Sequence, residues 1–413
     1  MVNTQLHVAL CRSCREGLRE IPAVRKPVGH RILVASWRTR AITSSRRMRA
    51  ARQILSILRA WRRGRGELCP VNSLQEIDDQ GWVEFSSREK LAPTLAKAIE
   101  ELALEKYLPA DLVVWLQLAR RRNMERNECI LDEIEKFTRH LNEIGVSPCF
   151  LKGAAYILDD VYGDIGDRFF VDVDCLLPEG QLSEAFERLL KVGYTPWEIE
   201  GISDSSAHLH PLFSPTYEVS FELHRHISYL SPLDTKVLPA RSVLNRSEER
   251  RRGEIVFRLP NMTHRLSHVL SHATLSPEQL LRGGLYLRDL IDLDILCQRA
   301  SPREQKKSVS CFHYSTLLRT RAESALSAAS ILLGTPIEKF GPISAVGKVG
   351  GNLAVSRLDG PAQAIICRLV GMTSYLCLSI LHRPDSFSTT LVNIYRQVRR
   401  DLGFGRTQEE RDG

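Results

Sequence analysis

The sequence lacks the features of an exported or membrane-spanning protein. No stretch combines a basic start, an apolar segment and a small-residue cleavage site. The longest apolar stretch, residues 362–381, is interrupted by Arg368, Thr373 and Ser374. We therefore expect neither export nor contact with a membrane, and a cytoplasmic location.

A disulfide framework and a zinc finger are also missing. The ten cysteines are scattered through apolar runs, without the dense, regular spacing of small secreted domains. Cys11 and Cys14 form a Cys-x-x-Cys pair, but no second Cys/His pair follows at the spacing of a zinc finger. The cysteines indicate a reduced setting and predict no zinc site.

Excess positive charge is absent beyond the first 66 residues. The chain has a formal net charge of +8, yet residues 1–66 hold 16 Lys and Arg against Glu16 and Glu20. The remaining residues therefore carry 41 basic and 47 acidic groups. We expect residues 1–66 to be a disordered, Arg-rich extension. The alternatives are a tail that binds nucleic acid, which is less favoured, and a gene start placed too early, with initiation near Met48.

Hydrophobic periodicity divides the rest of the chain into three regions. Apolar residues recur at three- and four-residue steps over residues 87–141 and again from Met262, which is typical of helices. Between them, predicted helices and strands alternate. The prediction is an α+β protein with a small mixed β-sheet flanked by helices and a helical C-terminal domain. The expected regions are 1–66 (extension), 67–145 (N-terminal helical region), 146–260 (mixed core) and 261–413 (helical C-terminal domain). Within the core we expect strands at 146–151, 169–177 and 217–224 and helices at 154–160 and 181–192.

Two aspartates share one face of the strand predicted at 169–177. Successive side chains of a strand point to opposite faces, so Asp172 and Asp174 lie together and apolar side chains lie on the other face. Neighbouring carboxylates repel each other unless a cation or a proton intervenes, and Mg²⁺ binds through one or two carboxylates plus substrate phosphates. The alternative is a solvated strand face. Because Asp is depleted from strands, the pair favours a metal site.

A third carboxylate is available on the strand predicted at 217–224. Strict alternation places Glu218, Ser220, Glu222 and His224 on one face and apolar residues on the other. If this face joins that of the aspartate pair, Glu222 or Glu218 can complete a two-metal arrangement. An amphipathic edge strand with a wet face remains the alternative.

The dipeptide Lys152-Gly153 lies at a predicted junction between a strand and a helix. Glycine permits close approach of the backbone, and the amide N–H groups at a helix start attract phosphate. Lys152 adds a positive charge. We therefore expect a triphosphate to bind at this junction.

These motifs follow one another in a specific order. They are Leu-Lys-Gly-Ala-Ala (151–155), Tyr162-Gly163, Arg168, Asp172-Val-Asp174, Gly193-Tyr194 and Glu222-Leu-His224. The order resembles the uncharacterised bacterial nucleotidyltransferase family within the DNA polymerase β-like superfamily. The resemblance covers roughly residues 75–300, and it implies that residues 146–260 form a nucleotidyltransferase catalytic core.

The resemblance also implies a role for each matching residue. Gly153 matches the glycine of the superfamily's Gly-Gly/Ser turn. Asp172 and Asp174 match its metal-binding acidic pair, and Glu222 matches the third acid on a neighbouring strand. Arg168 matches the arginine that precedes the acidic pair, where it would meet phosphate.

The sequence departs from this pattern at two places. Ala154 stands where Ser is common, which removes a hydroxyl ligand for phosphates. The segment Phe169-Phe170-Val171 is bulkier than the small residues or Met expected before the first Asp. These changes favour nucleotide binding over turnover.

The resulting hypothesis is an enzyme that moves an NMP from an NTP to a hydroxyl of an acceptor and releases pyrophosphate. It would depend on Mg²⁺, with Mn²⁺ as the alternative ion. Its catalytic and metal-binding residues would be Asp172, Asp174 and Glu222, and its nucleotide-binding residues Lys152, Gly153 and Arg168. The acceptor is left open between a small molecule, a protein and a tRNA.

Three other functions remain as alternatives. One is a non-catalytic nucleotide-binding module, which Ala154 favours and the three retained acids oppose. Another is a toxin-like transferase that modifies a protein or tRNA. A nucleic-acid scaffold working through the Arg-rich extension is the weakest of the three.

Two helical patterns beyond the core receive structural interpretations. Three histidines recur every four residues: His264, His268 and His272. No Glu accompanies them as in a zincin motif, so we expect a helix packed beside the site with one histidine pointing in. Asp289, Asp292 and Asp294 are interpreted as a solvated helix face.

Overall fold

The computed structural model describes most of the chain from residue 44 to residue 356. The described ranges are 44–64, 71–74, 76–197, 207–227, 237–276 and 285–356, with single positions at 358, 367, 369–370, 372–374 and 377. No helix in these ranges is long and apolar enough to cross a membrane. Residues 1–43 of the predicted extension, with the Cys11/Cys14 pair, lie outside the described residues.

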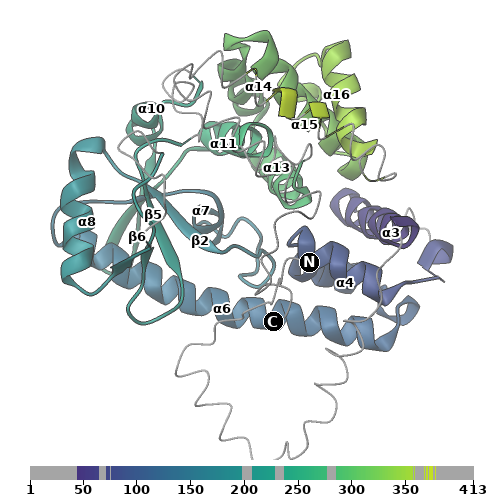
Figure 1. Ribbon diagram of the computed structural model, residues 1–413, viewed down its shortest axis with the longest axis horizontal. Coiled ribbons are helices and arrows are strands. Elements are labelled where there is room, and N and C mark those ends of the chain that lie inside the picture. Colours follow the sequence, from purple (N-terminus) through teal and green to yellow (C-terminus); the bar gives the residue numbers. More distant parts are fainter. Residues whose placement is uncertain are drawn as a thin grey trace, which may run out of the picture.

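A mixed sheet lies at one end of the molecule (Figure 1). Its seven described strands, in spatial order, are β3 (Thr195–Pro196), β4 (Leu212–Phe213), β5 (Ser220–His224), β2 (Asp172–Leu176), β1 (Cys149–Phe150), β7 (Ile255–Leu259) and β6 (Glu248–Arg252). Strand β2 runs parallel to β5 and antiparallel to β1, and β1 runs parallel to β7. The predicted α+β class is confirmed. The three predicted strands correspond to β1, β2 and β5, each shorter than expected.

Helix α6 (Ala110–Asn142) runs beneath the sheet and the N-terminal helices (Figure 1). One stripe of its apolar side chains is almost completely buried because it faces the core: Leu112, Leu116, Ile130, Ile134, Phe137 and Leu141. Phe137 of α6 stacks on Phe221 of β5, with ring centroids 4.2 Å apart. Helix α7 (Lys152–Leu158) follows β1, α8 (Leu182–Lys191) follows β2 and the short α10 (Ala240–Asn245) precedes β6.

The described chain from Met262 onward is helical. Its helices are α11 (Met262–Leu275), α13 (Leu287–Arg299), α14 (Pro302–Ser310), α15 (Thr316–Leu333) and α16 (Ala345–Ser356). Polar residues define where these helices begin: the Asn261 side chain accepts a hydrogen bond at the start of α11, and Ser301 and Glu304 form a capping box on α14. Gly334, with φ of 69°, ends α15 in the left-handed conformation.

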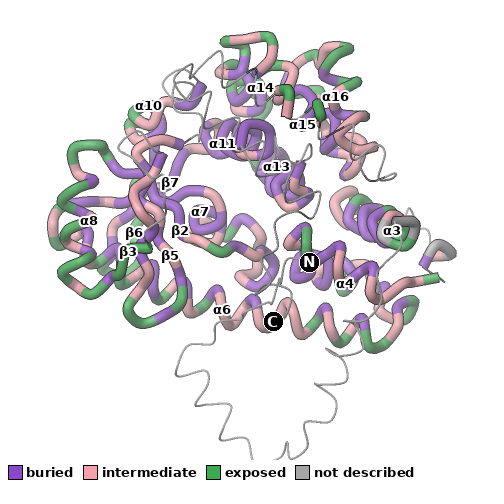
Figure 2. The backbone as a smooth tube through the Cα atoms, in the orientation of Figure 1, coloured by how far each residue is buried: buried purple, intermediate pink, exposed green. Residues whose placement is uncertain are grey.

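The prediction of a disordered extension is wrong for residues 44–63. They form helix α3 (Ser44–Arg63), which packs beside α4 (Asp79–Arg88) and α5 (Ala92–Glu101). The arginine count concealed an apolar stripe that includes Ile54 and Leu58, both fully buried. One hydrophobic cluster runs from this helix through the sheet to α15, so buried segments appear throughout the molecule (Figure 2). The boundaries between the four predicted regions remain predictions.

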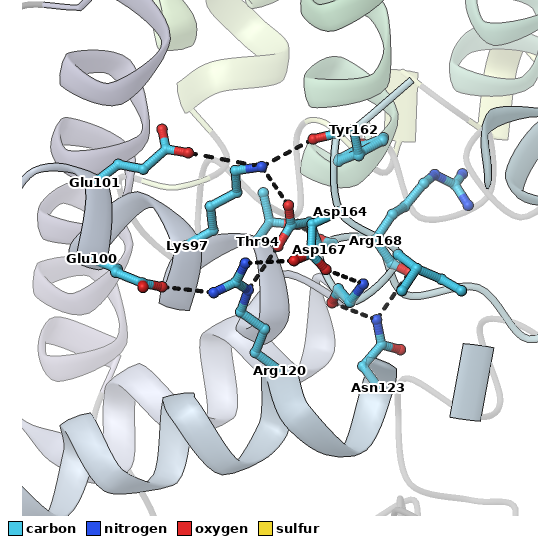
Figure 3. A network of polar contacts seen from close by, with 12 residues as sticks. Thr94, Lys97, Glu100, Glu101, Arg120, Asn123, Tyr162, Asp164, Asp167 and Arg168 are labelled. Atoms are coloured by element: carbon cyan, nitrogen blue, oxygen red, sulfur yellow. Dashed lines mark hydrogen bonds and ion pairs between the residues drawn. The ribbon is translucent and has the colours of Figure 1, made fainter. Parts of the chain in front are cut away.

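A buried polar network holds the loop between α7 and β2 (Figure 3). At its centre the Asp167 carboxylate, fully buried, accepts hydrogen bonds from Lys97 of α5 and, at 2.7 Å, from Nε of Arg120 of α6. The hydroxyl of Thr94 donates to the Asp167 carbonyl at 2.6 Å, and the Asn123 amide donates to the Gly166 and Arg168 carbonyls. We call Thr94, Lys97, Arg120, Asn123 and Asp167 the Asp167 network. It fixes the loop that delivers the first aspartate to β2.

Candidate active site

The parallel pairing of β2 and β5 places three acids on one face of the sheet. Asp174 lies opposite Glu222 in the register, and Asp172 lies opposite Ser220. Side chains at alternate positions share a face, so the acids of both strands point the same way. The two polar strand faces, whose meeting the sequence left as a condition, lie side by side in the sheet. Their exposure differs: Asp174 is 1% exposed, whereas the Glu222 side chain is 16% exposed.

Two cationic side chains contact the buried aspartate. Nζ of Lys152 lies 3.0 Å from Oδ1 of Asp174, and Nε2 of His224 lies 2.8 Å from the same oxygen. His224 also lies 3.3 Å from Oε2 of Glu222, and Nε2 of His208 lies 3.7 Å from that oxygen. We call Asp172, Asp174, Glu222, Lys152 and His224 the acidic cluster. It contains more acids than cations.

The cluster's charge separates the pKa values of its two aspartates. Burial and the neighbouring charge of Asp174 raise the pKa of Asp172. Burial would also raise the pKa of Asp174, but Lys152 and His224 hold that pKa well below its usual range. Asp174 is therefore ionised at neutral pH.

The same field acts on the histidine. Burial alone would lower the pKa of His224, yet its hydrogen bonds to Asp174 and Glu222 raise it to about 9. For Glu222, burial works against ionisation, but the hydrogen bond from His224 lowers the pKa below its ordinary value. A field that holds a proton between two carboxylates would equally attract a divalent cation.

Backbone strain and close packing mark the turn into α7. Lys152 has φ of 44°, a left-handed conformation that is costly for a residue with a side chain and that is found at functional sites. A Cβ on Gly153 would lie 2.4 Å from Nη1 of Arg168 and 2.7 Å from Cβ of Phe170. Glycine at 153 therefore allows the loop before β2 to approach α7. Ala154 is fully buried, so its side chain packs in the core.

Arg168 is directed into the protein. Its side chain is 4% exposed, and Nε and Nη2 pair with the two carboxylate oxygens of Asp292 at 2.8 and 2.7 Å. Tyr162 donates a hydrogen bond to the same carboxylate. Two of the three guanidinium nitrogens are thus committed to α13. The predicted contact of Arg168 with phosphate stays a prediction, and the geometry supports a structural role.

Helix α11 lies beside the acidic cluster, as expected, with one histidine close to it. His268 is buried, and burial together with the charge of Lys152 holds its pKa well below the ordinary value. His272 contacts Asp289 of α13 instead, at 2.8 Å from Nδ1 to Oδ2. The neighbouring Arg288 contacts Asp289 at 3.3 Å, and its charge acts on Asp172.

The interpretation of Asp289, Asp292 and Asp294 as a solvated face is wrong. All three are at most 2% exposed, and each pairs with a different part of the molecule. Asp289 pairs with His272, Asp292 with Arg168, and Asp294 with Arg62 and Arg63 of α3. Helical periodicity could not reveal this, because the partners lie on other elements, from 17 to 232 residues away in the sequence.

The donor atoms of the cluster suit a metal ion. Among the described residues, Asp174, Glu222 and His224 each offer a ligand atom within 4.8 Å of the others. Buried carboxylates paired with an imidazole are common metal ligands in proteins. Asp172 lies two residues earlier on the same face, outside this group of three. Sequence reasoning placed His224 on the correct face but did not select it as a ligand; its position two residues after Glu222 was the available signal.

A comparison with protein-family models gives one match. The model described as uncharacterised nucleotidyltransferase matches residues 75–322, more than half of the chain. The class of protein is therefore a transferase enzyme. The chain belongs to the uncharacterised nucleotidyltransferase family. No curated protein and no solved structure matches the chain.

Proposed function

We propose that the protein transfers an NMP from an NTP to a hydroxyl group of an acceptor, with a divalent cation held by Asp172, Asp174 and Glu222. The observation that carries the proposal is the register of β2 and β5, which sets Asp174 against Glu222 with Asp172 on the same face. The family membership and the strained Lys152 beside these acids support it. The arrangement is consistent with the DNA polymerase β-like superfamily.

The acids differ in what they can do. Asp174 is buried, ionised and held from two sides, so it serves as a fixed ligand. Glu222 is more exposed and can receive the proton that the acceptor hydroxyl loses as its oxygen attacks the α-phosphorus. A bound Mg²⁺ would neutralise charge on the phosphates and on the departing pyrophosphate.

Cations of this chain surround the position that we assign to the triphosphate. Lys152 lies at the start of α7, and Arg288 projects from α13 with its charge acting on Asp172. Arg126 of α6 lies over the ring of Phe169, 5.0 Å from its centroid, and also acts on Asp172. These groups would hold the phosphates by charge and position them for in-line attack. Gly153 and Arg168 would contribute indirectly, by fixing the conformation of the turn that carries Lys152.

The buried Ala154 bears on the non-catalytic alternative. Because its side chain packs in the core, a hydroxyl at this position would not point toward the cluster without a local change. Loss of the usual Ser therefore does not by itself remove a phosphate contact here. The retained acids favour chemistry over binding alone.

The proposal is tested with the full chain, each α-labelled NTP, Mg²⁺ or Mn²⁺, and cell extract as the source of acceptor. Label transfer by the wild-type protein, and its loss in Asp172→Asn and Asp174→Asn, would support NMP transfer and identify the NTP. Arg121→Gln, a change at an exposed position on α6, is the matched control and should transfer normally. Metal-dependent NTP binding without transfer would instead indicate a binding module. Label transferred equally by the aspartate variants would contradict the proposed site.

A further inference from the structure

We infer that His224 is a ligand of the metal centre, so that the centre has mixed nitrogen and oxygen ligands and selects Mn²⁺ over Mg²⁺. This inference rests on the metal site of the proposed function and changes its ligand set. The acids alone predict an all-oxygen centre, which suits Mg²⁺.

The first support is the direction of the imidazole ring. Nε2 of His224 lies 2.8 Å from Oδ1 of Asp174 and 3.3 Å from Oε2 of Glu222. The side chain is 2% exposed, so this nitrogen faces the carboxylates and not solvent. The three ligand atoms lie within 4.8 Å of one another, a separation that one ion can bridge.

The second support is independent of the acids and concerns the other ring nitrogen. Nδ1 of His224 lies 3.2 Å from the carbonyl oxygen of His226. Metal-binding histidines usually donate their second N–H to a carbonyl or carboxylate, which fixes the tautomer and aims the free nitrogen at the ion. The backbone therefore holds His224 in the orientation that a ligand requires, and a bound ion would take the place of the proton that Nε2 otherwise shares with the two carboxylates.

A second imidazole lies at the rim of the same group. The rings of His208 and His224 are 5.2 Å apart, and an isolated β-bridge joins the two residues. His208 lies 3.7 Å from Glu222 through Nε2. The side of the centre near β5 is thus rich in imidazole, and the side near Asp172 is rich in oxygen.

This ligand set has a consequence for the choice of ion. Transition ions accept an imidazole nitrogen more readily than Mg²⁺, which prefers oxygen ligands and retains several waters, and Mn²⁺ is the transition ion that also suits carboxylate ligands. Replacing His224 by an amide should therefore weaken Mn²⁺ binding far more than Mg²⁺ binding. The expected loss of Mn²⁺ affinity is about tenfold or more.

The test uses the full chain with Mn²⁺ alone, followed by competition with Mg²⁺. Pulsed electron paramagnetic resonance of the Mn²⁺-loaded wild-type protein should show coupling to ¹⁴N, which changes to ¹⁵N coupling when histidine is ¹⁵N-labelled. His224→Gln and His224→Asn should lose that coupling and lower the ratio of Mn²⁺ to Mg²⁺ affinity about tenfold. His140→Gln, the same change at a half-buried position on α6, should alter neither.

The outcomes separate this inference from the proposed function. Bound Mn²⁺ without nitrogen coupling in the wild type would overturn the role of His224 while leaving metal-dependent transfer intact. Nitrogen coupling together with absent NMP transfer would support the ligand and count against the proposed reaction. Failure of the wild type to bind either ion would overturn both. Because the labelling measurement needs no variant, a His224 variant that fails to fold does not prevent a decision.

Discussion

The Asp167 network and the acidic cluster use similar groups in opposite proportions. In the network a single buried carboxylate accepts hydrogen bonds from Lys97 and Arg120, and Thr94 donates to the backbone carbonyl of the same residue. In the cluster Asp172, Asp174 and Glu222 share Lys152 and His224. The two sites are linked by the loop that leads into β2.

The difference shows how charge balance separates a structural site from a reactive one. The network satisfies its carboxylate internally, so its contribution is to the stability of the loop. The cluster gathers three carboxylates around only two cations in direct contact, Lys152 and His224, together with a strained backbone at Lys152. Natural proteins tolerate such local cost where function requires it.

The largest effect is expected from Asp174→Asn. NMP transfer should fall at least about 1,000-fold, or ~4 kcal/mol in transition-state stabilisation, because the buried ligand loses its charge. The free energy of unfolding should fall by only about 1 kcal/mol: the attraction of Asp174 for Lys152 and His224 is lost, but the amide keeps an acceptor oxygen and the repulsion from Asp172 and Glu222 falls. Transfer rates and urea unfolding measure the two effects. A variant that keeps activity but unfolds easily would reverse the comparison.

In the Asp167 network the main effect should be on stability. Asp167→Ala should lower the free energy of unfolding more than Asp174→Asn does. Removing the carboxylate leaves Lys97 and Arg120 without their buried partner, so the free energy of unfolding should fall by about 3 kcal/mol. Urea unfolding at fixed pH measures this loss. Asp167→Asn, which keeps an acceptor, should lose less. A fall below about 1 kcal/mol in the alanine variant would show that the network is not a stability element.

A double-mutant cycle on Arg168 and Asp292 decides whether Arg168 is a structural residue, like those of the Asp167 network, or a phosphate-binding residue of the active site. If the pair is structural, Arg168→Ala and Asp292→Ala should show a coupling energy of about 2 kcal/mol in unfolding. The free energy of unfolding of the double variant should then be close to that of each single variant. Coupling close to zero, with a raised KM for the NTP in Arg168→Ala alone, would restore the phosphate role predicted from the sequence.

An exposed ion pair supplies the smallest effect and the baseline. Nη1 of Arg49 lies 2.6 Å from Oε2 of Glu76, and the two side chains are 57% and 77% exposed. Glu76→Gln should change the free energy of unfolding by less than about 0.5 kcal/mol, because water and salt screen exposed pairs. The measurement is urea unfolding at low and high salt. A larger effect would mean that the differences above do not come from burial.

Strand periodicity predicted the centre of the site well. Alternation along two strands placed Asp172 and Asp174 on one face and Glu222 and His224 on another, and the structure joins these faces. Alternation is a local property, so the sequence carries it directly. The parallel register that sets Asp174 against Glu222 depends on the folded sheet and could only be stated as a condition.

Two predictions were wrong, and both concerned charged residues: the disordered extension at residues 44–63 and the solvated face of α13. Each interpreted the charges from their sequence neighbours alone. The arginines of residues 44–63 suggested an unstructured basic extension, yet Arg62 and Arg63 pair with the buried Asp294. The aspartates of α13 suggested a solvated helix face because their paired cations were not apparent from the sequence. Whether a charge is solvated or paired depends on partners that other elements bring close, here from 17 to 232 residues away, and neither spacing nor composition records them.

Helix α13 also determines how the protein should come apart. Its three buried aspartates connect it to α11, to the loop before β2 and to α3, so separating any of these parts exposes an unpaired charge. Such connections oppose stepwise unfolding, in which one part melts while the others persist. The helices from Met262 onward and the sheet should therefore melt in a single cooperative transition. The active site should lose its structure at the same temperature as the helices around it.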